Sequence, residues 1–131
     1  MKEQIALYEA KLAYEMDSWD LYEALQRGDD VVVVDARAAG AYAAEHIPRA
    51  ANIPHRTMTA ESTAGLSREA LYVVYCDGIG CNASTKGALN LARLGFQVRE
   101  LIGGLDWWKR DGYATEGEEG REGRVVDCGC G

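Results

Sequence analysis

The stretch LYVVYCDGIGCNASTKGALNLARLG, residues 71–95, decides the fold. It begins with a run of β-branched and aromatic residues, which predicts a buried strand. Residues 76–82 then form a loop with two glycines and two cysteines. Residues 83–94 carry apolar side chains at helical spacing, and Gly95 ends this pattern as a helix C-cap. Because a glycine-bearing loop at a helix N-terminus favours an anion, we interpret Cys76 as a thiolate nucleophile. The alternative is a buried cysteine at a strand end, with a packing role only.

The alternation of strand and helix continues on both sides of this stretch. Four successive valines, residues 31–34, predict a strand that is buried on both faces, as in a parallel sheet. The pattern therefore indicates an α/β sheet with helices on both faces. In such sheets the ligand site lies beyond the carboxyl ends of the strands, so we expect Asp35 and Cys76 at that edge. The remaining strands are expected at residues 15–16, 51–53 and 98–101, and the helices at 2–14, 18–27, 38–45 and 105–110, with a further short helix at 59–64.

Length and charge limit the function. A chain of 131 residues is expected to form one domain, and its net charge of −7 argues against a nucleic acid or a membrane surface as partner. The N-terminus has mixed charge and a helical pattern, unlike a signal peptide. We therefore expect a cytoplasmic protein with reduced cysteines. Four cysteines in that compartment favour catalysis, redox sensing or metal binding over a disulfide framework.

Three segments in order resemble the signatures of the rhodanese family. VVVVDARAAGAYAAEHIPRAANIP, residues 31–54, is similar to its strand, Asp-x-Arg, Tyr, His-Ile-Pro-x-Ala and Asn-Ile-Pro. Residues 72–76 with the glycine loop resemble its active-site loop, and GGLDWWKRDG, residues 103–112, resembles its closing signature. The resemblance implies a three-layer α/β/α rhodanese-like fold, with a mainly parallel five-stranded sheet, over residues 1–115. Residues 116–131, which end in Cys128-Gly-Cys130, are predicted to form a flexible tail rich in glycine and glutamate.

The resemblance also implies an activity. In this family the loop cysteine takes a sulfane sulfur from thiosulfate or a persulfide, and passes it to a thiol, to cyanide or to a protein acceptor. No metal and no cofactor take part. Cys76 is then the catalytic residue, and Asp35, Arg37 and Lys86 are supporting residues. The residues of the substrate-binding loop are Asp77, Gly78, Ile79, Gly80, Cys81 and Asn82.

The loop departs from the usual family pattern. Single-domain members have Arg at the fifth position after the catalytic cysteine, where this chain has Cys81. Counted back from Gly95, the loop is about two residues longer than usual and contains no Arg. Lys86 and Arg49 are the candidates for the missing cation that would bind an anionic donor. Asp35 and Arg37 are expected to form an ion pair close to the site.

The second thiol leaves several alternatives open. Cys81 resolves the persulfide or forms a disulfide with Cys76, contributes to acceptor chemistry, or only fills space. Cys128 and Cys130 form an exposed thiol pair or accept sulfur from Cys76. A zinc site is disfavoured because the spacing of the cysteines is not a zinc pattern. For the whole protein, the rivals to a sulfurtransferase are a non-catalytic sensing or binding module and a cysteine-dependent phosphatase.

Overall fold

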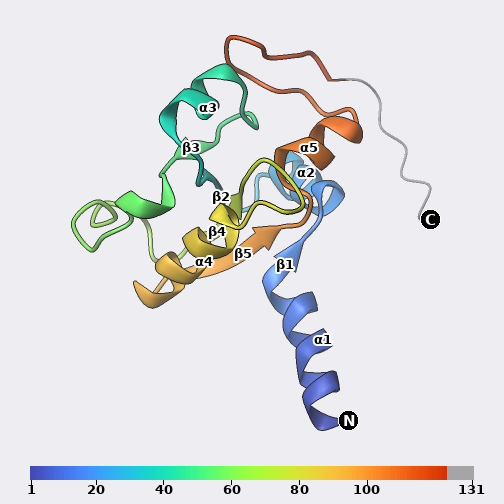
Figure 1. The fold of residues 1–131 in the computed structure, drawn as a ribbon, viewed down its shortest axis with the longest axis vertical. Helices are drawn as coiled ribbons and strands as arrows, with labels where there is room; N and C mark the ends of the chain where they lie inside the picture. Colours follow the sequence, from blue (N-terminus) through green and yellow to red (C-terminus); the bar gives the residue numbers. More distant parts are fainter. Residues whose placement is uncertain (124–131) are drawn as a thin grey trace.

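The computed structural model describes residues 1–123, and Figure 1 traces their path. A single sheet of five strands has the order β1-β5-β4-β2-β3, and every neighbouring pair is parallel. The strands are β1 (Glu15–Met16), β2 (Val31–Asp35), β3 (Ala51–Asn52), β4 (Leu71–Tyr75) and β5 (Gln97–Leu101). The predicted α/β class and the parallel five-stranded sheet are therefore confirmed.

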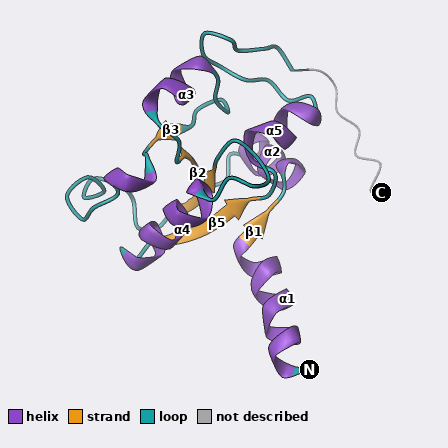
Figure 2. Cartoon of the chain, in the orientation of Figure 1, coloured by secondary structure: helices purple, strands orange, loops and turns teal. Residues whose placement is uncertain are grey.

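Helices lie on both faces of this sheet (Figure 2), as the prediction of three layers requires. The helices of the described chain are α1 (Lys2–Tyr14), α2 (Ser18–Arg27), α3 (Ala39–Ala44), the 3-10 helix η1 (His55–Thr57), α4 (Ala83–Arg93) and α5 (Gly104–Arg110). The predicted caps of α2 are confirmed, since Asp17 accepts a hydrogen bond from the backbone N–H of Asp20 and Gly28 takes a left-handed conformation. Residues 59–64 form hydrogen-bonded turns instead of the short helix that their sequence suggested.

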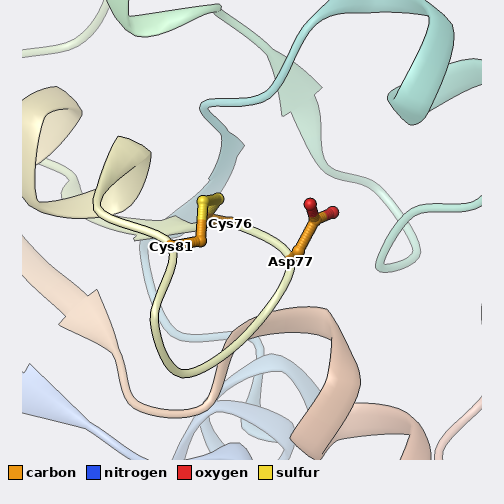
Figure 3. A group of neighbouring side chains, drawn as sticks. All are labelled: Cys76, Asp77 and Cys81. Atoms are coloured by element: carbon orange, nitrogen blue, oxygen red, sulfur yellow. A yellow bond between two sulfur atoms is a disulfide. The ribbon is translucent and has the colours of Figure 1, made fainter.

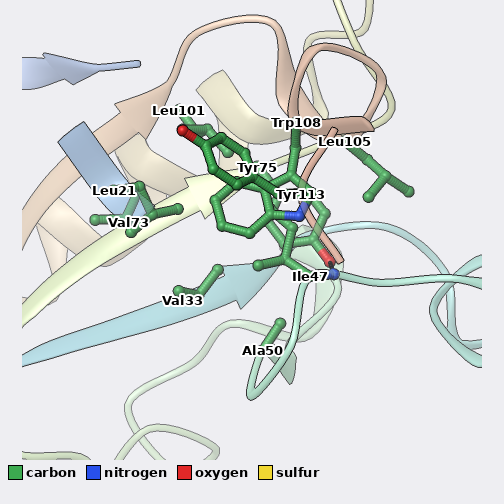
Figure 4. Packing of buried hydrophobic residues seen from close by; sticks show 10 residues of the cluster. All are labelled: Leu21, Val33, Ile47, Ala50, Val73, Tyr75, Leu101, Leu105, Trp108 and Tyr113. Carbon is green, nitrogen blue, oxygen red and sulfur yellow. Dashed lines mark hydrogen bonds between the residues drawn. The ribbon is translucent and has the colours of Figure 1, made fainter. Parts of the chain in front are cut away.

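The central strands bury both faces, because successive side chains point to opposite sides. Val33 contributes to a core cluster shared with α2 and α5, whereas Val34 contributes to a cluster beneath α4. Figure 4 shows the first cluster, which consists of Leu21, Val33, Ile47, Ala50, Val73, Tyr75, Leu101, Leu105, Trp108 and Tyr113. The second consists of Val34, Ala36, Met58, Ala70, Tyr72, Val74, Leu91 and Phe96. The continuous valine run thus reflects burial on both faces.

The two ends of the described chain differ in how closely they pack against the rest of the domain. Helix α1 projects away from the domain and contains no buried residue (Figure 1). The segment from Glu116 to Arg121 instead lies against α3. There, Glu116 forms a two-way backbone pair with His46, and Glu118 N–H donates to the carbonyl of Ala43. The first part of the expected tail is therefore hydrogen-bonded to the domain, and Cys128 and Cys130 lie outside the described residues.

Within residues 1–123, no helix is both long and apolar enough to cross a membrane.

Candidate active site

The candidate site lies at the carboxyl edge of the sheet, between β2 and β4. The strands that follow these two in the chain lie on opposite flanks of the pair: β3 pairs with β2 at one flank, and β5 pairs with β4 at the other. A crevice is expected where the chain direction divides in this way. A pocket of about 420 Å³ occupies this position. It is lined by Ala36, Arg37, Ala38, Ala41, Pro54, His55, Arg56, Cys76, Asp77, Cys81 and Ala83.

Cys76 and Cys81 lie together at one wall of this pocket. Cys76 follows directly on β4 and is 2 % exposed, while Cys81 is partly exposed. A disulfide joins the two residues, with their Cα atoms 6.3 Å apart. Figure 3 shows the loop leaving Cys76, passing Asp77 and returning to Cys81, so that the disulfide closes the base of the loop. The sequence left three roles open for Cys81, and the structure shows that the loop brings it into bonding contact with Cys76.

The start of α5 holds the beginning of this loop in place. The backbone N–H of Leu105 donates to the carbonyl of Cys76 (2.9 Å), and that of Asp106 donates to the carbonyl of Asp77 (2.8 Å). Gly104 has φ +56°, and a Cβ at this position would collide with the Cys76 carbonyl oxygen and lie 3.0 Å from the amide nitrogen of Gly78. The second glycine of the Gly103-Gly104 signature therefore permits a close approach of backbone to backbone.

The remaining loop residues have distinct positions. Gly78 packs against Asp106, where an added Cβ would lie 3.1 Å from the Asp106 Cβ, and Gly80 has the positive φ (+95°) that the turn requires. Ile79 is 81 % exposed at the tip. Asn82 is the N-cap residue of α4, and within the described structure its side chain makes no capping hydrogen bond. Because Asn82 does not cap them, the first N–H groups of α4 can donate to an anion beside the cysteines.

Arg37 connects β2 to the active-site loop. Its guanidinium pairs with Asp35 (Nη2 to Oδ2, 2.7 Å), as expected, and its Nη1 also donates to the Asp77 carboxylate (3.0 Å). Burial opposes the charge on Arg37, but the hydrogen bonds and the charge of Asp35 outweigh it and raise the pKa of Arg37. The carboxylate of Asp77, next to Cys76 in the loop, opposes ionisation of the thiol. The structure supplies it with a cationic partner, which offsets part of its charge.

A buried hydrogen-bond network fixes this ion pair. The Tyr75 hydroxyl donates to Oδ2 of Asp35 (2.8 Å) and accepts from the backbone N–H of Ile47 (3.1 Å). Burial and the charge of Asp35 raise the pKa of this hydroxyl, so it stays protonated and can donate. The Asn52 amide donates to the carbonyls of Asp35 and Arg37. No sequence motif singled out Tyr75 or Asn52, although each is the last residue of a strand at the edge where the site was expected.

Glu45 links Arg37 to α5 and to the segment that follows α5. Its carbonyl accepts from Arg37 Nη2 (2.6 Å), and its carboxylate accepts from Lys109 (2.7 Å) and from the hydroxyl of Thr115 (2.6 Å). Burial opposes the charge of Glu45, but Lys109 and Thr115 outweigh it and lower the pKa of this carboxyl. Because Arg121 lies 3.7 Å from the same carboxylate, these contacts tie α5 and residues 115–121 to the helix beside the pocket.

The cations of the pocket are not those that the sequence suggested. Lys86 and Arg49 are exposed, and neither is among the residues that line the pocket. Lys86 lies one turn into α4, beyond the loop, and Arg49 lies in the turn before β3, near Glu116. Arg56 lines the pocket instead, as does its neighbour in sequence, His55. Both follow β3 at the carboxyl edge, a position from which the topology could have identified them.

The site also offers one set of metal-ligating atoms. The two cysteine sulfurs and a carboxylate oxygen of Asp77 lie within 4.8 Å of one another. In the disulfide state neither sulfur is a thiolate, which is the form that binds metals.

Comparison with known proteins identifies the family. The profile described as the Rhodanese-like domain matches residues 18–111. The chain belongs to the rhodanese-like domain family. Among solved structures, a protein of Bacillus halodurans is 41 % identical, with a TM-score of 0.85 over 91 % of this chain and 88 % of that chain. The rhodanese-related protein of Thermoplasma volcanium is 26 % identical, with a TM-score of 0.68 over 79 % of this chain and 97 % of that chain.

A third similar structure is the rhodanese-like domain of a protein from Anabaena, which is 27 % identical with a TM-score of 0.70, over 87 % of this chain and 92 % of that domain. The comparison with curated proteins gives no match. The rhodanese-like relatives therefore establish the fold and the family, and the chemistry has to be argued from the site.

Proposed function

We propose that the protein is a sulfurtransferase that carries a sulfane sulfur as a persulfide on Cys76. The observation that supports this most is the position of Cys76, which directly follows the central strand β4 and forms a wall of the pocket beside the N-terminus of α4. Such a position favours a thiolate and then an anionic persulfide. Cys76, the N-terminus of α4 and the pocket would thus supply the nucleophile, the anion-binding groups and the route by which the donor enters.

In the first half-reaction the reduced protein binds a donor such as thiosulfate. The Cys76 thiolate attacks the outer sulfur of the donor, the sulfur–sulfur bond of thiosulfate breaks, and sulfite leaves with the electron pair. Arg56 and His55 line the pocket that the dianion would enter. Arg37 also lines the pocket, but it is already engaged by Asp35 and Asp77, so its role is to hold the loop.

In the second half-reaction an acceptor attacks the outer sulfur of the persulfide. A thiol would leave with that sulfur as a new persulfide, and cyanide would leave as thiocyanate. The Cys76 thiolate is restored in either case, so no metal or cofactor is needed. We place this activity in the cytoplasm, with a small-molecule donor and either a small-molecule or a protein acceptor, because reduced thiols are required.

A phosphatase needs strong positive stabilisation of the phosphoryl group, usually from an Arg in the loop. This loop has none. A module that only senses or binds would not need a cysteine at the wall of a pocket, beside the N-terminus of a helix, that can admit a sulfur donor. We therefore rank the sulfurtransferase above both rivals.

The experiment combines mass spectrometry with an activity assay. Reduced protein treated with thiosulfate is expected to release sulfite, and with cyanide also present it is expected to form thiocyanate. Cys76→Ser should abolish both products, while Cys128→Ser, at a thiol outside the described structure, is the matched control. Wild-type protein that releases no sulfite and forms no thiocyanate with either thiosulfate or a persulfide donor would refute the proposal.

A further inference from the structure

We infer that Cys81 resolves the Cys76 persulfide, so that the protein releases the transferred sulfur as hydrosulfide and is left with a Cys76–Cys81 disulfide. This inference rests on the proposed persulfide and adds to it the fate of the sulfur. The observation that carries it is the disulfide itself, which places Cys81 Sγ in direct bonding contact with the sulfur that would bear the persulfide.

Both cysteines are held where this reaction needs them. Cys76 is fixed by β4 and by the N–H of Leu105, and Cys81 by its own N–H, which donates to the carbonyl of Gly78 (3.2 Å). The Cα atoms are 6.3 Å apart, inside the range of roughly 4.4–6.8 Å that disulfides span. The backbone therefore suits the bond while β4, α4 and the start of α5 keep their packing.

The resolving step is balanced without an outside oxidant. The Cys81 thiolate attacks Sγ of Cys76, a new sulfur–sulfur bond forms, and the bond between Cys76 Sγ and the outer sulfur breaks. The outer sulfur takes the electron pair and leaves as hydrosulfide, with the proton that the Cys81 thiol gives up when it becomes the attacking thiolate. The sulfane sulfur is reduced to sulfide, and the two cysteine sulfurs are oxidised to the disulfide.

Two features of the site favour this step over a long-lived persulfide. A thiol tethered in the same loop reacts at a far higher effective concentration than an acceptor that must diffuse into the pocket. The Asp77 carboxylate also lies within 4.8 Å of both sulfurs and opposes negative charge there, although Arg37 offsets part of its effect. Expelling hydrosulfide removes an anion from this crowded site.

The same geometry defines the reductant that would restore the enzyme. Cys81 is partly exposed, whereas Cys76 is buried, so an incoming thiolate reaches Sγ of Cys81 first. That attack releases Cys76 as the thiolate and leaves a mixed disulfide on Cys81, which the second thiol of a dithiol then displaces. The structure thus points to a dithiol, as a small molecule or a protein pair, as the reductant.

The test is a single turnover in protein carrying C128S and C130S, so that Cys76 and Cys81 are the only thiols. The reduced protein is freed of reductant under anaerobic conditions and treated with excess thiosulfate and no acceptor. The expected result is one equivalent each of sulfite and hydrosulfide per chain, the loss of both thiols, and a peptide in which Cys76 is linked to Cys81. Adding C81S is expected to abolish hydrosulfide release and leave the mass of one extra sulfur atom on Cys76.

The outcomes separate this inference from the proposed function. Sulfite release with a persistent persulfide in the Cys81-containing protein would overturn the role of Cys81 but leave the sulfurtransferase standing. Equal release of hydrosulfide with and without C81S would likewise overturn the role of Cys81 and leave the sulfurtransferase standing. If neither thiosulfate nor a persulfide donor loads Cys76, and cyanide yields no thiocyanate, the proposed function fails and the inference with it.

Discussion

Replacing Gly104 by Ala should break the contact that holds the active-site loop. The residue has φ +56°, and an added Cβ would meet the backbone of Cys76, Asp77 and Gly78, none of which can rotate away. The left-handed conformation costs an alanine about 1–2 kcal/mol. Displacing the loop also weakens the hydrogen bonds from Leu105 and Asp106, each with a net contribution of about 1 kcal/mol. The expected loss of unfolding free energy is therefore about 3–4 kcal/mol.

Gly28→Ala is the matched control. Gly28 also has a left-handed φ (+75°), but nothing lies within 4 Å of a Cβ built there. This variant should lose only about 1–2 kcal/mol, from the backbone conformation alone. Urea unfolding measures both, and with a slope of roughly 1–3 kcal/mol per M the two midpoints should separate by about 1 M. Thiocyanate formation should fall strongly in Gly104→Ala alone. Equal midpoints for the two variants would refute the argument that the loop is held by this close approach.

Three further predictions concern the network around the pocket. Tyr75→Phe removes a hydroxyl that both donates and accepts inside the core, so urea unfolding should show a loss of about 1–3 kcal/mol, and an unchanged midpoint would contradict the network. The lowered pKa of Glu45 adds stability that is fully present above its ordinary value of 4.5 and is lost as the pH falls through the lower folded value. Unfolding measured from pH 6 down to about pH 3 should therefore be less pH-dependent in Glu45→Gln than in wild type. Arg56→Ala should raise KM for thiosulfate about 3- to 10-fold with a smaller change in kcat, whereas Lys86→Ala, outside the pocket, should leave KM unchanged.

The sequence predicts the fold well because local signals and burial agree. The valine run of β2 has no alternation since both of its faces are covered, and Gly28 and Gly95 end helices by the positive φ that each adopts. Residues 59–64 were harder to predict. Their backbone is fixed by side-chain hydrogen bonds, such as that from Ser62 to the carbonyl of Thr57, which compete with helix formation.

Site residues could be predicted from the sequence only where they lie at the end of a strand with a clear sequence pattern. Asp35 is the last residue of the valine-rich strand β2 and Cys76 directly follows β4, so the topology places both at the carboxyl edge. Arg56 follows a strand of two residues, and so brief a strand gives little periodicity to extend. The cation at the pocket was therefore sought in Lys86, which is closer to Cys76 in sequence. The pairing of Arg37 with Asp77 joins residues 40 positions apart, and no local pattern encodes it.

The attachment of the loop to α5 has a consequence for how the protein is made. Cys76 emerges during synthesis long before Gly104, Leu105 and Asp106, the residues that hold its carbonyl and that of Asp77. Strands β2 and β4 are complete by then, but β5 and α5 are not. Since the loop takes its shape only against the start of α5, the thiol acquires its reactive setting at almost the last step of domain folding. The persulfide chemistry proposed for Cys76 is therefore expected only once the domain has folded.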